Sequence, residues 1–257
     1  MPPKRGQSLR LVSLNLAHGR RVSAHQAFLK RGTAEKNVGQ VAKLLRQLAP
    51  DVVALQEADG PSAWSGNFDH VATLADRARL GDHFRGNHNP FGSDRYPLAS
   101  GTALMAAMPL EDQLSEPFAT NWRDTKGFVV AACQVPQWTD RTIDVVSVHL
   151  DFLRPGIRRQ QILRLVHALI HRRRPLVVMG DLNCCWQRES TTLELFREHL
   201  DLHAYLPYES APTFPSSKPR RRLDWVLASK DLAFGDYHTL RSPLSDHLAI
   251  VADIHPA

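Results

Sequence analysis

Polar side chains end several apolar segments of this sequence, and their types are those that handle phosphates and metal ions. In VVMGDLNCC, three apolar residues run into Gly180 and Asp181, with Asn183 two positions later. Side chains two positions apart on an extended backbone leave by the same face. Taken alone, such residues could simply cap a turn. Others end or immediately precede apolar segments in the same way: Asn15, Glu57, His149, Asp224, Asp246 and His247.

Together these residues indicate a shared cation. A buried carboxylate without a partner is costly, so acids at several strand ends must be exposed or must share a metal ion. Magnesium prefers one or two carboxylates together with water and substrate phosphate oxygens. Histidines can supply proton transfer or charge stabilisation. The set would neutralise oxygens, aim a water and stabilise a leaving group, which favours phosphoester chemistry.

Such a set needs strands to position it, and hydrophobic patterning predicts them. Three- to four-residue periods predict helices over 35–48, 68–80, 157–171 and 190–199. Strands and helices do not alternate strictly, so we expect sheets with antiparallel pairs and helices packed outside them. Alternation or apolar runs predict strands over 9–15, 51–57, 101–107, 127–135, 142–150, 177–181, 221–229 and 247–254.

Composition sets the broad class. The 257 residues are 43% hydrophobic and show no internal repeat or linker, which predicts a single domain over 1–257 with a flexible tail at 1–8. The net charge is +6, with 25 Arg against 7 Lys, which suits a phosphorylated substrate or reflects genome composition. Three cysteines predict free thiols in a reducing compartment. No segment matches a signal peptide or an integral membrane span, so we expect a cytoplasmic protein, and no protein partner is evident.

Six motifs occur in order between about residues 9 and 254: SLNLAHG, LQEAD, SVHLD, GDLN, RLDWVLAS and SDHLAI. In this series the chain resembles the endonuclease/exonuclease/phosphatase superfamily, which includes abasic-site endonucleases, pancreatic-type deoxyribonuclease, neutral sphingomyelinases and inositol-polyphosphate phosphatases. The resemblance implies an α/β (α+β) fold, a four-layered sandwich of two mixed, largely antiparallel β-sheets with helices on the outer faces. It also implies in-line hydrolysis of a phosphoester by metal-activated water, without a covalent intermediate.

The same resemblance implies roles for single residues. Glu57 would be the principal Mg²⁺ ligand, with Mn²⁺ as a possible substitute ion, and Asn15 beside it would touch the metal or the phosphate. Asp181 would orient and deprotonate the attacking water. Asn183 would hold the scissile phosphate, and His149 would donate to a phosphate oxygen.

The last motifs supply three more residues under the resemblance. Asp246 would bind either His247 or the metal. His247 would stabilise the pentavalent phosphorus or the leaving oxygen. Asp224 would be an acid that fixes the geometry of the others.

Three further residues keep two interpretations each. His18 could contact a substrate phosphate or lie in an exposed loop. Asp151 could orient His149 or cap the turn before residues 154–156. Arg222, which ends the run 220–222, could bind substrate because this run leads directly into the segment of Asp224.

The motifs do not select a substrate, because one fold can carry many activities. The sequence shows the motif-bearing core with modest loops and no appended binding module, and it has no stripe of Lys and Arg interleaved with aromatics. These features favour a phosphodiesterase or phosphatase acting on a small or lipid-derived phosphoester. The basic charge leaves an endonuclease or exonuclease on DNA or RNA as the alternative. A catalytically silent binding protein is the third hypothesis. We expect the segment 81–97, rich in His, Asn and Arg, to set specificity.

Overall fold

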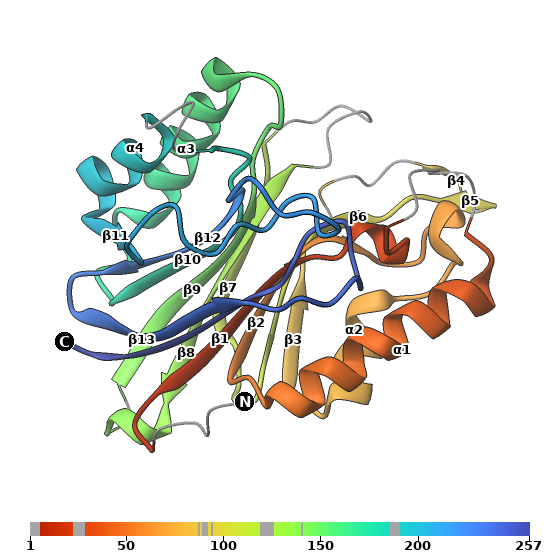
Figure 1. Cartoon of the computed structure of the whole chain (residues 1–257), viewed down its shortest axis with the longest axis horizontal. Helices are drawn as coiled ribbons and strands as arrows, with labels where there is room; N and C mark the ends of the chain where they lie inside the picture. The colour runs from red at the N-terminus through yellow and green to blue at the C-terminus, as the bar shows by residue number, and fades with distance from the viewer. Residues whose placement is uncertain are drawn as a thin grey trace.

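The computed structural model describes residues 6–22, 29–86, 88, 92–93, 95–118, 126–139, 141–185 and 191–257. They form two six-stranded sheets that lie face to face, with two helices against the outer face of each (Figure 1). This arrangement confirms the expected four-layered sandwich of mixed sheets with outer helices.

The first sheet has the strand order β13-β14-β1-β2-β6-β3, and only its central pair, β1 and β2, is parallel among the described strands. Helices α1 (Arg31–Leu48) and α2 (His70–Ala78) pack on its outer face. The strands are β1 (Leu9–Asn15), β2 (Val52–Asp59), β3 (Asp82–Arg85), β6 (Ser100–Ala106), β13 (Leu232–Thr239) and β14 (Ile250–Pro256).

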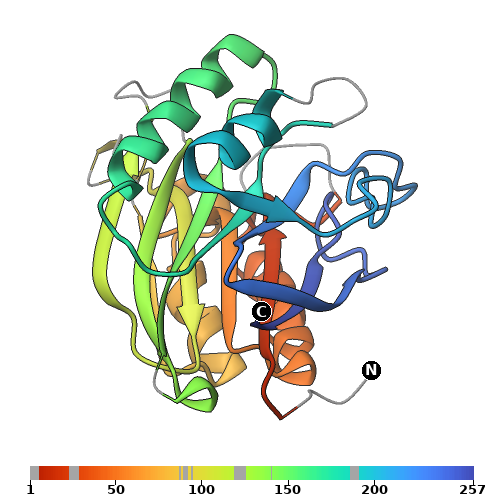
Figure 2. The same ribbon diagram turned by 90° about the vertical axis from the view of Figure 1, so that its left-hand side faces the viewer.

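The second sheet has the order β11-β12-β10-β9-β8-β7, with β9 and β10 parallel. Helix α3 (Pro155–Leu169) connects these two strands, and α3 and α4 (Thr191–Leu200) cover the outer face (Figure 2). The strands are β7 (Glu111–Pro117), β8 (Gly127–Val135), β9 (Arg141–His149), β10 (Leu176–Asp181), β11 (Leu202–Ala204) and β12 (Asp224–Ser229).

Every helix and strand expected from the patterning is present, with ends shifted by a few residues. The segment 81–97 is more structured than a loop, because it contains β3 and a hairpin of β4 (Gly92–Ser93) and β5 (Tyr96–Pro97). Its residues 87, 89–91 and 94 lie outside the described residues. None of the helices in the described part of the chain is both long and apolar enough to cross a membrane.

The tail expected over 1–8 is only partly covered, because residues 1–5 lie outside the described residues. From Gln7 onward the chain packs against the body. The Gln7 carbonyl accepts a hydrogen bond of 2.6 Å from Trp138 Nε1, and Ser8 is buried.

The layer between the sheets changes from apolar to polar along the strands. In β1 the inward side chains run from Leu9 and Leu11 to Ser13 and Asn15, and all four are buried. The same change occurs at the ends of β9 and β10, where the last inward positions are occupied by His149 and Asp181, and at the start of β12, where Asp224 precedes the core residues.

Beneath this polar end, a hydrogen-bonded bridge joins the two sheets. Gln56 Nε2 donates to Ser147 Oγ at 3.0 Å, and Ser147 Oγ donates to the Leu55 carbonyl at 2.9 Å. The two sheets are therefore held in register just below the polar residues.

Candidate active site

Asp181 ends β10, and Gly180 allows its neighbours to come close. Gly180 has φ +150°, and a Cβ there would lie 1.9 Å from the Val148 carbonyl oxygen of β9. Only glycine permits this approach without displacing one strand. The register then places Asp181 beside His149 of β9 and Asp224 of β12. The glycine in VVMGDLNCC thus serves to gather three chemically active residues.

The Asp181 carboxylate contacts most of the other residues of the candidate site. Its Oδ1 accepts from the Asn183 backbone N–H at 3.0 Å, and its Oδ2 accepts from Asn15 Nδ2 at 3.0 Å. The same Oδ2 lies 3.4 Å from His149 Nε2 and 3.8 Å from His247 Nε2. Burial alone would raise the pKa of Asp181, but the charge of His247 and the hydrogen bond to His149 lower it well below its usual range. Asp181 is therefore ionised and can accept a proton.

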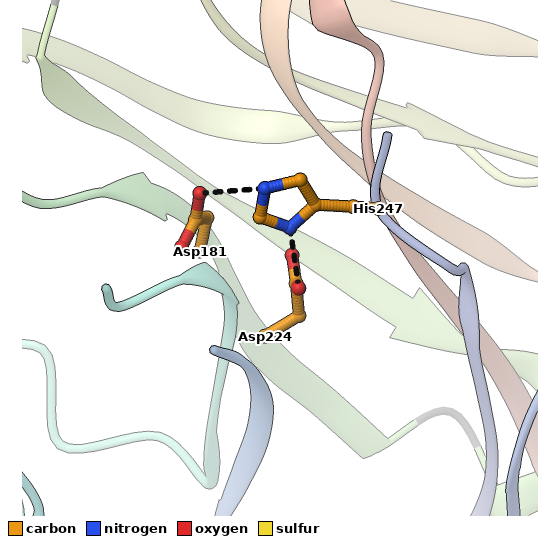
Figure 3. Close-up of side chains that lie close together, drawn as sticks. All are labelled: Asp181, Asp224 and His247. Atoms are coloured by element: carbon orange, nitrogen blue, oxygen red, sulfur yellow. Dashed lines mark hydrogen bonds and ion pairs between the residues drawn. The ribbon is translucent and has the colours of Figure 1, made fainter. Parts of the chain in front are cut away.

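Asp224 and His247 form a buried pair next to Asp181 (Figure 3). His247 Nδ1 lies 2.7 Å from Asp224 Oδ2, so its Nε2 faces Asp181. Burial would lower the pKa of His247, but the charges of Asp224 and Asp181 raise it to about 10. His247 is thus an imidazolium at neutral pH. Asp224, rather than Asp246, is the acid that contacts the His247 ring.

His149 faces a cation that the sequence did not single out. Lys126 Nζ lies 2.5 Å from His149 Nε2 and 3.2 Å from its Nδ1. Burial and the Lys126 ammonium lower the pKa of His149 below its ordinary value. His149 is therefore neutral here, and Lys126 brings the positive charge to this side of Asp181.

Glu57 reaches the site through an irregularity in β2. The pairing of β2 with β6 shifts register between Leu55 and Ala58, and Glu57 has φ +49°. Such bulges re-aim a side chain next to active sites. The Glu57 carboxylate lies 3.4 Å from His18 Nε2 and 3.7 Å from Arg20 Nη2, both longer than a good hydrogen bond. Burial would raise the pKa of Glu57, but the charges of His18 and Lys126 lower it to about 2.

His18 is not in an open loop but belongs to a second histidine–acid pair. Its Nδ1 lies 2.8 Å from Asp59 Oδ1, and Asp59 Oδ2 accepts from Trp64 Nε1 at 2.8 Å. Asp59 is fully buried. Burial would lower the pKa of His18, but Asp59 and Glu57 raise it above its usual value.

Four residues expected in the site make contacts other than those expected for them there, and they are Asn183, Asp151, Asp246 and Arg222. Asn183 has φ +50° and donates from Nδ2 to the Leu150 carbonyl at 3.0 Å, so its side chain braces the loop after β10. Asp151 accepts from the backbone N–H groups of Leu153 and Arg154 at 2.9 and 2.7 Å. The turn-capping interpretation of Asp151 is therefore the one that its contacts match.

Asp246 is half-buried and accepts from Ser245 Oγ at 3.2 Å, and it has no contact with the His247 ring among the hydrogen bonds and ion pairs of the described residues. Arg222 does not face substrate: its side chain is buried and donates to the Tyr205 carbonyl and the Tyr237 hydroxyl at 3.1 and 2.7 Å. Its guanidinium stacks over the Trp225 ring at 4.0 Å. A stacked, buried arginine of this kind fixes the base of β12, which corrects the substrate-binding interpretation.

Two residues of the site, Lys126 and Asp59, escaped the sequence analysis. Lys126 immediately precedes β8, whose first residue, Gly127, pairs with His149 in the neighbouring strand. Asp59 follows Glu57 by two residues in LQEAD. A charged residue beside a predicted strand end was the available signal in both cases, but the partner of each lies on a different segment.

The residues suit a divalent cation. Ligand atoms of Asp181, Asp224 and His247 all lie within 4.8 Å of one another. One oxygen of Asp224 is buried and accepts no hydrogen bond from the described residues. The Glu57 carboxylate is 20% exposed, ionised and held only by long contacts, so it can take an ion from solvent. These are hard oxygen donors with one or two imidazoles nearby, which is a donor set that divalent cations accept.

The acids, amides and imidazoles gathered at one end of this two-sheet sandwich are the groups that phosphoester hydrolysis uses. The chain belongs to the Endonuclease/Exonuclease/phosphatase family, whose sequence profile matches residues 12–247. This membership indicates phosphoester hydrolase activity, and the family's enzymes generally depend on a divalent metal.

Solved structures share the fold at low sequence identity. An endonuclease/exonuclease/phosphatase from Beutenbergia cavernae is 19% identical with a TM-score of 0.74, covering 98% of this chain and 72% of its own. The human Nocturnin catalytic domain with bound sulfate is 18% identical with a TM-score of 0.70, covering 98% and 95%. D. rerio TDP2 in complex with a single-stranded DNA product is 17% identical with a TM-score of 0.69, covering 96% and 99%. No curated protein matches the chain significantly in sequence.

Proposed function

We propose that this protein is a divalent-metal-dependent phosphodiesterase or phosphatase that hydrolyses a small or lipid-derived phosphoester. The observation that carries the proposal is Asp181, an ionised carboxylate held between Asn15, His149 and the imidazolium of His247. A general base needs such an ionised, oriented carboxylate.

The residues divide the hydrolytic step among them. Asp181 accepts the proton of the attacking water while the water oxygen forms its bond to phosphorus and the ester P–O bond breaks. Asn15 and the Asn183 backbone N–H hold that carboxylate in place. His247, kept cationic by Asp224, stabilises the negative charge that develops on the phosphate oxygens. His149 and Lys126 add donors on the other side of Asp181.

Glu57, with Asn15 beside it, would hold the metal, and Asp246 lies in the loop before β14 as a further candidate. We expect Mg²⁺, with Mn²⁺ as a possible substitute, because Glu57 is an ionised oxygen donor. When bound, a divalent cation neutralises phosphate oxygens and polarises the scissile bond. The sequence holds three cysteines, an odd number that cannot pair fully within the chain, which supports a cytoplasmic, reducing location for this single-domain enzyme.

The rim of the site supports a substrate with an apolar part. Phe152 and Leu153 are 63% and 69% exposed, and they follow His149 by three and four residues. Large exposed apolar side chains side by side mark a binding surface more often than chance exposure. We expect an acyl or alkyl group attached to the phosphate to contact these two side chains.

A nuclease remains the second candidate because of a basic hollow near His247. The hollow has a volume of about 550 Å³ and is lined by Lys218 and Arg241 with Ser216, Ser217, Pro219, Ser242 and Pro243. Ser216 N–H donates to the Asp246 carbonyl at 2.7 Å, so the hollow adjoins the loop of His247. Lysine and arginine there suit phosphate oxygens of a nucleic-acid strand, and the TDP2 structure holds a DNA product.

The deciding experiment compares wild-type protein with Asp181→Asn on three substrates: bis(p-nitrophenyl) phosphate, p-nitrophenyl phosphate and supercoiled plasmid. We expect chelator-sensitive hydrolysis of a small ester by the wild type and a loss of about 10²- to 10⁴-fold in Asp181→Asn. Plasmid nicking by the wild type alone would move the assignment to a nuclease. A folded, metal-binding wild-type protein that hydrolyses none of them would contradict the proposal.

A further inference from the structure

We propose that His18 is a metal ligand, so that His18 and Glu57 form a mixed nitrogen and oxygen site that prefers Mn²⁺ and similar transition-metal ions to Mg²⁺. This inference rests on the proposed function, because it requires that the metal bind at Glu57. It assigns a coordination role to a residue for which the sequence left two interpretations, a contact with a substrate phosphate or a place in an exposed loop.

Unusual backbone geometry brings the two side chains together. Ala17, His18 and Gly19 have φ values of 49°, 52° and 72°, and Glu57 has φ +49°. Such conformations are uncommon for residues with a Cβ, and they cluster at functional sites. The result is a separation of 3.4 Å between His18 Nε2 and Glu57 Oε2.

The other ring nitrogen of His18 is fixed in the way that metal-ligating histidines require. Asp59 Oδ1 lies 2.8 Å from His18 Nδ1, and the Asp59 carboxylate is itself held by Trp64 Nε1 at 2.8 Å. The Trp64 ring packs against the His18 ring with centroids 5.2 Å apart. Ligating histidines almost always donate their second N–H to a carboxylate, which aims the free lone pair. Here Nε2 of His18 faces Glu57, and an ion bound there would take the place of the Nε2 proton.

The distance and the exposure both fit a shared ion. Two ligand atoms each about 2.1 Å from one ion lie about 3.0 to 3.4 Å apart at octahedral to tetrahedral angles. The observed separation of 3.4 Å falls within that range. The side chains of His18 and Glu57 are 15% and 20% exposed, whereas that of Asp181 is 2% exposed. An ion can therefore reach the pair directly from solvent.

An imidazole ligand changes which ion the site prefers. Mg²⁺ demands oxygen ligands and keeps several waters. Imidazole suits first-row transition metals, and their affinity for nitrogen donors rises along the series from Mn²⁺. We therefore expect tighter binding of Mn²⁺ than of Mg²⁺, which refines the expectation of Mg²⁺ that was based on Glu57 alone.

The test uses Mn²⁺ alone, without substrate, and pulsed electron paramagnetic resonance to detect nitrogen coupled to the ion. The wild type should show ¹⁴N coupling, and His18→Gln should lose it. The matched controls His149→Gln and His247→Gln should retain it, since neither residue belongs to the proposed ligand pair. Coupling that persists in His18→Gln, or that is absent in a wild type that binds Mn²⁺, would overturn the inference.

Calorimetric titration gives a second readout that does not depend on activity. We expect the Mn²⁺ dissociation constant to rise about 10- to 100-fold in His18→Gln and in Asp59→Asn. The Mg²⁺ dissociation constant should change by less than about threefold, because Mg²⁺ gains little from imidazole. Equal losses for both ions would contradict the nitrogen-ligand role. A folded wild type that binds neither ion would overturn the metal site of the proposed function and this inference with it.

Discussion

Asp181 and Asp224 are both buried carboxylates, yet their neighbours give them different tasks. Asp181 has donors or cations on several sides, which hold its pKa below the usual range. Burial and the nearby charge of Asp181 raise the pKa of Asp224, whose side chain contacts the His247 ring. Pairs of acids whose environments separate their pKa values commonly divide base and supporting roles. Asp181 is therefore suited to accept a proton, and Asp224 to orient a histidine.

Replacing Asp224 by Asn should lower kcat by about 10²- to 10⁴-fold. An amide can donate to His247 Nδ1, which would reverse the tautomer and remove the charge that keeps the ring cationic. Steady-state kinetics on a small ester, with the thermal unfolding midpoint as a folding control, measure the effect. A folded Asp224→Asn protein with wild-type kcat would rule out this role.

His88 provides a pH-dependent contribution to stability. Its ring is buried, its Nε2 lies 3.4 Å from Ser115 Oγ, and burial lowers its pKa from 6.5 to about 4. The unfolded chain therefore binds an extra proton between about pH 6.5 and pH 4, so stability falls as pH falls through this window.

The free energy of unfolding of the wild type should drop across that window by up to about 1.4 kcal/mol per pH unit from this residue. His88→Asn should remove this part of the slope, whatever its effect on stability at neutral pH. Urea unfolding at several pH values measures both slopes. Identical slopes in the two proteins would mean that His88 does not titrate in this range.

At the level of secondary structure, the close approach of β9 and β10 makes the site. Gly180→Ala would place a Cβ 1.9 Å from the Val148 carbonyl oxygen at a φ that favours glycine. We expect a destabilisation of about 2 to 4 kcal/mol and a loss of activity larger than the loss of folded protein. Both effects arise because Asp181 and His149 move apart with their strands.

Gly156→Ala is the matched control, because its Cβ would have no neighbour within 4 Å and it lies in α3. It should change stability by no more than about 1 kcal/mol, in the stabilising direction. Chemical denaturation and activity per folded molecule separate the two variants. Equal behaviour of Gly180→Ala and Gly156→Ala would show that the strand approach is not constrained as the distances indicate.

The strands that the sequence predicts lie inside the sheets, and four that it misses lie at their edges. The missed strands β3, β7, β11 and β13 are the two ends of each six-stranded sheet. Their faces are partly exposed, as in the EDQLSEP of β7, so they lack the apolar run or alternation that identifies a core strand. Hydrophobic patterning reveals strands whose side chains are buried, and the edge strands are too exposed to show such a pattern.

The residues of the site could be predicted from breaks in the hydrophobic pattern, but the pairs that they form could not. Asn15, Glu57, His149, Asp181 and Asp224 lie at or near the ends of strands that are mostly apolar, so each is visible as a break in a pattern. The pairings are not visible, since contact between segments depends on register. The Asp224–His247 pair, the approach of Lys126 to His149, and the burial of the Arg222 guanidinium against Trp225 and Tyr237 are all of this kind.

At the scale of the whole molecule, the described residues of the candidate site gather at one end of the β-sandwich. Among the described residues, the layer between the sheets becomes polar where β1, β9 and β10 end and where β12 begins, and helices pack on both outer faces (Figures 1 and 2). We therefore expect a substrate to approach along this end, where Phe152 and Leu153 are exposed three and four residues after His149, on a protein of net charge +6. An apolar rim on a basic protein is suited to an anionic lipid surface.

Phe152→Ser combined with Leu153→Ser should weaken binding to vesicles containing an anionic phospholipid by about tenfold or more, given about 1.5 to 3 kcal/mol for each buried apolar side chain. Hydrolysis of bis(p-nitrophenyl) phosphate should stay close to that of the wild type, because both side chains are largely exposed whereas Asp181 is buried. Cosedimentation with vesicles and turnover of the soluble ester measure the two effects separately.

Ile170→Ser is the control, because Ile170 is exposed by 55% but lies away from the site. It directly follows α3 and comes six residues before the start of β10, whereas Asp181 lies at the other end of that strand. It should leave vesicle binding unchanged. If Ile170→Ser and the double variant weaken vesicle binding equally, the effect is general hydrophobicity and not a rim built around the site. If neither changes it while nucleic acid competes for the protein, the basic hollow of Lys218 and Arg241 becomes the surface that selects the substrate.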